Sequence, residues 1–141
     1  MYIAELHKVL QELEIPSDSY YLHGLYGSTD DNEKLALSVK QGKYSTEFEV
    51  YFRERGEKHS TRTFIIEDEA CQHFLKSIKE SKTIERILKI DGLSGMTVNE
   101  RLYASGLMQE FDKCRKENKS RAKQILKWLK VNEASTKEII K

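Results

Sequence analysis

The sequence has little of what marks disulfide-rich, collagen-like or membrane proteins. Its 141 residues include one proline and two cysteines, and no stretch approaches the roughly 20 apolar residues that span a bilayer. The segment Met1–Lys8 has no basic stretch followed by an unbroken apolar run, so it does not read as a secretory signal. We therefore expect a cytoplasmic protein with no membrane partner, whose cysteines are reduced.

Residues that support catalysis or bind metals are few and dispersed. None of the four histidines has a partner at metal-ligand spacing. Cys71 and His73 are two positions apart on a predicted helix, so their side chains point about 200° apart and cannot act as nucleophile and base. The glycines form no phosphate-binding motif, and residues 30–33 lack the ligand pattern of a calcium loop. The sequence predicts no catalytic residue, no metal site and no cofactor, and hence a protein that is not an enzyme.

Length and charge indicate one folded domain with two different halves. Apolar residues make up 38% of the chain and charged residues 33%, with a net charge of +1, which is compatible with a stable core. We predict a single domain over residues 1–141, with residues 91–95 as its weakest boundary. Residues 1–80 hold 10 Lys and Arg against 15 Asp and Glu, whereas residues 81–141 hold 14 against 8. The halves, at −5 and +6, can present different surfaces to a partner.

Hydrophobic periodicity predicts an α+β fold. Helical spacing of apolar residues predicts a helix over 2–14, which Pro16 ends. Residues 20–22 can form a short strand, and alternation of apolar and polar residues predicts strands at about 35–39, 47–53 and 60–66. These make a three- to four-stranded antiparallel meander, which a helix beginning near residue 67 covers; residues 84–88 suggest a further short helical piece.

A C-terminal helical part is predicted over 96–141, beyond the α/β part at 1–80. Thr97 and Glu100 fit a capping box at the start of a helix that continues to Cys114. A second helix over 119–130 completes a helical hairpin, and residues 135–141 add a short last turn. Eight Lys and Arg residues make this hairpin basic, but they are spread around both helices, and no nucleic-acid-binding motif is present.

The middle strand offers a candidate surface. Glu47, Glu49, Tyr51 and Arg53 share one face, opposite Phe48, Val50 and Phe52. One interpretation is the solvated side of a half-covered sheet. The other is a docking surface for a basic protein, in which a tyrosine contributes much of the binding energy.

Two stretches resemble bacterial immunity proteins of polymorphic toxin systems. Phe48–Lys58 with Phe64–Leu75 resembles the strand, turn, strand and helix of these proteins, and Met96–Asp112 resembles a C-terminal helical module found in them. The resemblance implies a cytoplasmic protein that binds and neutralises a cognate secreted toxin domain, such as a nuclease.

The resemblance carries no mapped binding residues, so the candidate toxin-binding residues are exposed acidic and aromatic positions of the acidic half. They are Tyr26, Asp30, Asp31, Glu33, Glu47, Glu49 and Tyr51. The alternative is a regulator that binds nucleic acid through the basic C-terminal helices. The spread of charge around both helices argues against nucleic acid as the partner. Either a monomer or a homodimer is compatible with the sequence.

Overall fold

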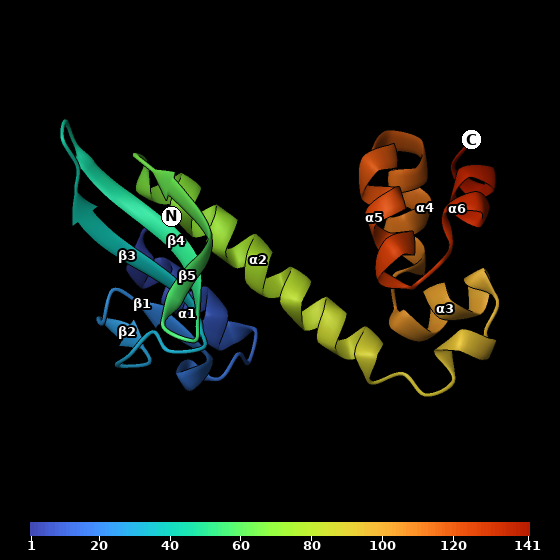
Figure 1. The fold of residues 1–141 in the computed structure, drawn as a ribbon, viewed down its shortest axis with the longest axis horizontal. Helices are drawn as coiled ribbons and strands as arrows, with labels where there is room; N and C mark the ends of the chain where they lie inside the picture. The colour runs from blue at the N-terminus through green and yellow to red at the C-terminus, as the bar shows by residue number, and fades with distance from the viewer. The chain divides into compact units, whose positions relative to one another are not determined.

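The computed structural model describes all 141 residues, which form two compact units, Met1–Lys79 and Glu80–Lys141 (Figure 1). The division falls inside helix α2 (Glu67–Leu88), and residues 91–95 lie within the second unit. Each unit has its own cluster of buried apolar residues, and the two clusters share no residue. The single domain over 1–141 stays a prediction.

The first unit combines two helices with a five-stranded sheet. The predicted N-terminal helix is confirmed as α1 (Ile3–Glu12), and its apolar spacing buries Ile3, Leu6 and Leu10. The remaining elements of this unit, besides the first part of α2, are η1 (Ser17–Ser19), β1 (Tyr20–Leu22), β2 (Tyr26–Gly27), β3 (Leu35–Gln41), β4 (Thr46–Glu54) and β5 (Glu57–Phe64). The α+β class is therefore confirmed.

The predicted antiparallel meander is wrong in strand number and order. The sheet has five strands in the order β2-β1-β3-β4-β5, and β1 pairs with β3 in parallel while every other pairing is antiparallel. Only β3, β4 and β5 form a meander. The two-residue strand β2 is too short to give a periodic signal, and it turns the chain back so that β1 and β3 run in the same direction.

Gly27 makes this return of the chain possible. Its φ of 77° lies in the left-handed region, and a Cβ added there would sit 2.6 Å from the Tyr20 carbonyl oxygen. No side chain fits so close to the neighbouring backbone. The β1–β2 pairing therefore requires glycine at this position.

One face of the sheet packs against both helices of the first unit. Leu22, Leu37 and Val50 from three strands belong to the same buried cluster as Leu6 of α1 and Phe74 of α2. Alternation along β3 and β4 places these side chains on one side of the sheet. The opposite side carries the polar residues described in the next section.

Helix α2 is longer than predicted. The stretch 67–78 and the separate piece at 84–88 are one continuous helix of 22 residues. The segment between them, Lys79–Thr83, contains no apolar residue, which is why the periodic signal lapses; it also contains no glycine or proline, so nothing in it breaks the helix.

The second unit contains four helices where a hairpin was predicted. Its elements are the end of α2, η2 (Leu93–Gly95), α3 (Val98–Ser105), α4 (Met108–Glu117), α5 (Lys119–Trp128) and α6 (Glu133–Ile140). The capping box is confirmed, since Thr97 Oγ1 accepts from the Glu100 backbone N–H and Glu100 Oε1 accepts from the Thr97 backbone N–H, both at 3.2 Å. The predicted long helix is interrupted at Gly106, whose φ of 74° ends α3. Tyr103 of α3 is 82% exposed.

Arg101, on α3, joins the segment around η2 to the end of α5. Its guanidinium donates from Nη1 to the carbonyls of Leu129 (3.0 Å) and Lys130 (3.1 Å). Nε donates to the Met96 carbonyl at 3.1 Å and Nη2 to the Ser94 carbonyl at 3.3 Å. A positive charge is favourable at the C-terminal end of a helix, where backbone carbonyls lack partners within the helix.

Candidate functional site

The sheet face opposite the core, which we call the open face, presents polar side chains from four strands. Pairing register places Tyr21, Ala36 and Tyr51 in one row across β1, β3 and β4. Residues two positions apart on a strand share a face. The open face is therefore made of Tyr21, Ala36, Ser38, Lys40, Glu47, Glu49, Tyr51, Arg53 and Lys58.

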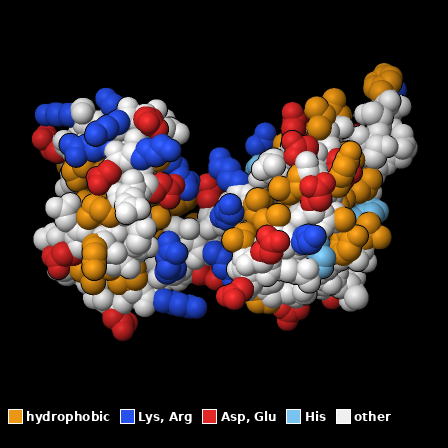
Figure 2. All heavy atoms as spheres, turned by 180° about the vertical axis from the view of Figure 1, so that it is seen from behind, with side chains coloured by type: hydrophobic (Ala, Val, Ile, Leu, Met, Phe, Trp, Pro, Cys, Tyr) orange, Lys and Arg blue, Asp and Glu red, His pale blue; other side chains and the backbone are white.

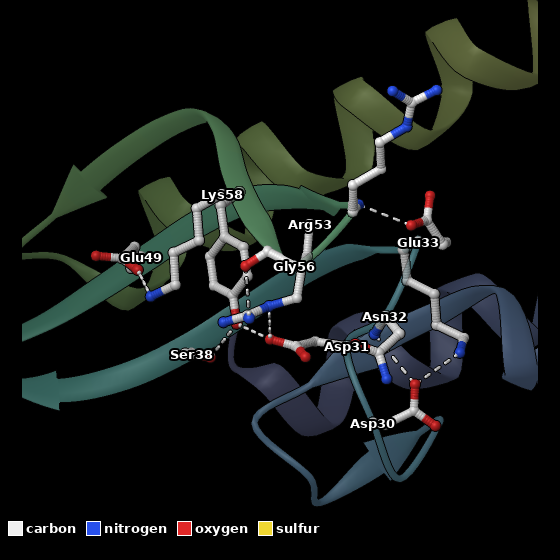
Figure 3. Close-up of polar contacts among 12 residues, drawn as sticks. Asp30, Asp31, Asn32, Glu33, Ser38, Glu49, Arg53, Gly56 and Lys58 are labelled. Atoms are coloured by element: carbon white, nitrogen blue, oxygen red, sulfur yellow. Dashed lines mark hydrogen bonds and ion pairs between the residues drawn. The ribbon is translucent and has the colours of Figure 1, made fainter.

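Tyr51 is the centre of one hydrogen-bond network on the open face, and its partners Ser38 and Asp31 are labelled in Figure 3. Its hydroxyl donates to Asp31 Oδ2 at 2.7 Å, and Arg53 Nε donates to the same oxygen at 3.0 Å. The hydroxyl also lies 3.1 Å from Ser38 Oγ. Because a phenol has one proton and Asp31 accepts it, Ser38 is the donor in this last contact. Asp31 thereby attaches the loop after β2 to the sheet.

Glu49 is the centre of a second, adjoining network. Lys40 Nζ lies 2.8 Å from Glu49 Oε2, and Lys58 Nζ lies 2.6 Å from Oε1. The ammonium of Lys58 is also 4.5 Å from the centroid of the Tyr51 ring, within the range of a cation–π interaction. Lys58 therefore connects the two networks, and β3, β4 and β5 are joined through side chains as well as through backbone.

These contacts determine the ionisation of the site. Hydrogen bonds from Lys40 and then Lys58 hold the pKa of Glu49 below its usual value. Burial opposes ionisation of Asp31, but the Tyr51 hydroxyl and the Arg53 charge outweigh it and lower the pKa of Asp31. Burial, with a further contribution from Asp31, raises the pKa of Tyr51 to about 12. At neutral pH both carboxylates are charged, and Tyr51 keeps the proton that it donates.

Two of the other predicted residues lie in the loop 28–34, beside this face. Asp30 accepts from the Asn32 backbone N–H at 3.0 Å and pairs with Lys34 at 3.2 Å. Glu33 Oε1 accepts from the Arg55 backbone N–H at 2.8 Å. Both side chains contribute to the shape of the loop, and both residues are exposed.

The structure places six of the seven predicted residues on or beside the open face, but it alters the exposure of two. Glu49 and Tyr51 were expected on the solvated side, yet they are only 6% and 3% exposed. They are covered by each other's networks, by the Asp31 loop and by lysine side chains. Tyr26 lies apart from the group, because it stacks on His7 with ring centroids 4.7 Å apart and packs against the first unit's core.

Three partners in the two networks were not singled out from the sequence: Ser38, Lys40 and Lys58. The first two share the parity of Ala36 on β3, so alternation alone already placed them on this face. Lys58 could be found only through the register of the β4–β5 hairpin, where it pairs with Arg53. The contacts of Ser38 and Lys40 with Tyr51 and Glu49 follow from the β3–β4 register, and that of Lys58 from the β4–β5 register.

Outside this face the structure adds few chemical groups. No cluster of three or more His, Cys, Asp and Glu side chains is arranged to hold a metal ion. Both cysteines are free, and burial raises the pKa of Cys71 to about 12, so its thiol is protonated at neutral pH. None of the helices has both the length and the apolar character that crossing a bilayer requires.

Fold and site together define an α+β protein with one helix-covered and one polar sheet face. No protein-family model, curated protein or solved structure matches the chain.

Proposed function

We propose that this protein binds and neutralises a cognate toxin domain, without catalysis of its own, and that the open face is its binding surface. The observation that carries the proposal is the pair of linked networks centred on Tyr51 and Glu49, which fixes charged and aromatic groups on the face that lies opposite the helices of the first unit. The resemblance of Phe48–Lys58 to immunity proteins falls on the same hairpin.

Prior ordering of these side chains favours tight binding. Association normally costs conformational entropy when long side chains are immobilised at the interface. Lys40, Arg53 and Lys58 are already held by carboxylate partners, while their side chains stay 49%, 29% and 43% exposed. A partner therefore meets a surface whose polar groups are in place.

The net charge of the first unit as a whole favours a cationic partner, although the open face itself exposes lysine and arginine side chains. The first unit holds 10 Lys and Arg against 14 Asp and Glu, a formal charge of −4. Acidic residues on its surface accelerate association with a basic domain, as expected for a nuclease that binds phosphates. In Figure 2 both signs of charge lie among hydrophobic side chains on the visible surface. The steering field is therefore the sum of many charges and not one uniform patch.

The first test is co-expression with the toxin-like domains encoded beside the gene. We expect one of them to co-purify in a one-to-one complex, and growth of the host to be restored. An interface of about 1,600 Å² is typical for such complexes. If no neighbouring toxin domain is bound and no growth is restored, the toxin proposal is wrong.

Glu47→Lys tests the surface. Glu47 is half-buried on the open face but, unlike Glu49, forms no ion pair within 4 Å, so its reversal should leave the fold intact. We expect slower association and weaker protection. Glu117→Lys is the matched control, since it changes the charge equally at an exposed position of the second unit. Equal protection by both variants would place the binding surface elsewhere.

A further inference from the structure

Helix α5 presents an exposed face made only of lysine, serine and glutamine. Lys119, Lys123 and Lys127 follow one another at intervals of four residues, so they form a single stripe. Ser120 and Gln124 are the other exposed residues of the helix, and α5 contains no Asp or Glu. The sequence suggested that basic residues surround both helices evenly. On α5 the structure shows three of the four basic residues on one side.

No carboxylate of the chain lies within ion-pair distance, 4 Å, of a lysine of this stripe. Arg121, the other basic residue of α5, points away from it, with ion pairs to Glu80 at 2.8 Å and Glu110 at 3.1 Å. None of the three lysines takes part in an ion pair or a side-chain hydrogen bond. Lys119 also lies at the N-terminal end of α5, where the helix dipole is already positive. The arrangement is unfavourable by itself, and an anionic partner would relieve it.

The composition of the face fits phosphate groups in particular. Lysine, serine and glutamine are among the residues that contact phosphate oxygens in nucleic-acid complexes. The stripe is about 12 Å long at a rise of about 1.5 Å per residue, which matches three to four phosphates spaced about 3.4 Å apart along the axis of one strand. The second unit as a whole holds 14 Lys and Arg against 9 Asp and Glu, a charge of +5.

The absence of an exposed ring on this face favours a duplex over a single strand. Proteins that bind single strands stack bases on aromatic side chains. The only aromatic residue of α5, Trp128, is half-buried and lies under the Arg121 guanidinium, 4.6 Å from ring centroid to Cζ. The face offers charge and hydrogen bonds, but no surface on which a base stacks.

We propose that the exposed face of α5 binds the sugar–phosphate backbone of double-stranded nucleic acid without reading its sequence. The inference uses residues separate from the open face, so it stands or falls independently of the toxin proposal. With about three phosphates neutralised, log affinity should fall with log salt with a slope near −2.7, a loss of about 40-fold between 50 and 200 mM.

The test is fluorescence anisotropy of the full chain with 20-base-pair DNA and RNA duplexes of two unrelated sequences. We expect weak binding at 50 mM salt, equal for the two sequences, with the slope given above. Replacing all three lysines, K119A/K123A/K127A, should weaken binding at 50 mM by about tenfold or more and bring the slope close to zero. Alanine is a strong helix former, and circular dichroism of the variant checks that α5 persists.

The control variant K82A/K89A/K137A removes three lysines from other parts of the second unit. It has the same net charge, so it separates a specific face from general basicity. Equal loss in both variants would overturn the proposal. So would tighter binding to a single-stranded 20-mer than to the duplexes, or binding to phosphatidylserine vesicles with none to either duplex. A DNA or RNA preference decides which duplex is the partner.

Discussion

Tyr51 shows how one side chain can serve both the fold and a surface. Its ring contributes to the covered row formed with Tyr21 and Ala36, while its hydroxyl holds Asp31 and, through it, the loop 28–34. Its pKa of about 12 keeps the phenol protonated, so the donor is present at any physiological pH. Loss of the hydroxyl alone should therefore affect the loop and not the core.

Tyr51→Phe should lower the free energy of unfolding by about 1 to 2 kcal/mol, because Asp31 keeps only Arg53 as a side-chain partner. Urea denaturation measures the change. Tyr44→Phe is the control, since Tyr44 is 89% exposed and its hydroxyl has no partner, and it should change stability by less than about 0.5 kcal/mol. Equal effects of the two substitutions would mean that the Tyr51 hydroxyl does not stabilise the fold.

Glu49 predicts sensitivity to acid. Its folded pKa lies below the ordinary value of 4.5, so the ionised form stabilises the protein above that pH. This contribution is lost as the pH falls through the folded pKa, and Asp31 acts in the same direction from an ordinary value of 3.8. The Glu49→Gln variant should be less stable than the wild type at pH 7. It should also lose less free energy of unfolding than the wild type as the pH falls below 5.

Unfolding by urea at a series of pH values measures this slope. Glu133→Gln serves as a control, because Glu133 is exposed and has no ion pair, so its slope should match that of the wild type. A Glu49→Gln slope equal to that of the wild type would show that Glu49 is not the group responsible.

Much of the candidate site could be predicted from residue type and alternation. Glu47, Glu49, Tyr51 and Arg53 do share a face, as period two requires. Their burial could not be predicted, because it depends on Lys40, Lys58 and the Asp31 loop, which reach them only through tertiary register. Tyr26 was misplaced for a similar reason: its stacking partner, His7, comes from α1.

At the scale of elements, Arg101 is the residue on which the helical unit depends most visibly. It satisfies carbonyls at the end of α5 and beside η2, a task that needs several donors in a fixed plane. Arg101→Lys should therefore cost about 1 to 3 kcal/mol although the charge is kept. Thermal denaturation followed by circular dichroism measures it, with Arg115→Lys as control. An unchanged midpoint would mean that charge alone suffices.

The lysines of α5 should affect the helix in opposite ways at its two ends. Lys119→Glu puts a favourable charge at the N-terminal end and should raise stability by about 0.3 to 1 kcal/mol. Lys127→Glu puts the same charge near the C-terminal end, where it should lower stability by a similar amount. Chemical denaturation of both variants checks the pair. Effects of the same sign would contradict an origin in the helix dipole.

Element boundaries were predictable where local chemistry sets them and not elsewhere. The Thr97 capping box and the end of α1 before Pro16 follow from the sequence. Gly106 is also a local signal, since glycine commonly ends a helix, but the apolar spacing on both sides of it favoured one continuous helix. The parallel pairing of β1 with β3 gives no periodic signal, since it depends on a two-residue strand and on the approach that Gly27 allows.

At the scale of the molecule, the two buried clusters predict separable local stabilities. Leu37 lies in the first and Ile125 in the second, and both are fully buried. Leu37→Ala and Ile125→Ala should each cost about 2 to 5 kcal/mol within their own unit. Native-state hydrogen exchange should show the loss of protection in β3 and β4 for the first variant, and in α4 and α5 for the second. Equal loss throughout the chain for either variant would mean that the two units unfold together.

The parallel pairing of β1 with β3 also bears on the order in which the first unit assembles. The hairpins β3–β4 and β4–β5 join neighbours in sequence, and such local contacts form quickly. Strand β1 can add only after the chain between Leu22 and Leu35 has closed on itself, which costs loop entropy before any pairing is gained. We therefore expect the two hairpins to form first and β1 to pair last. Until β1 pairs, the edge of β3 that it will cover is open to strands of other chains.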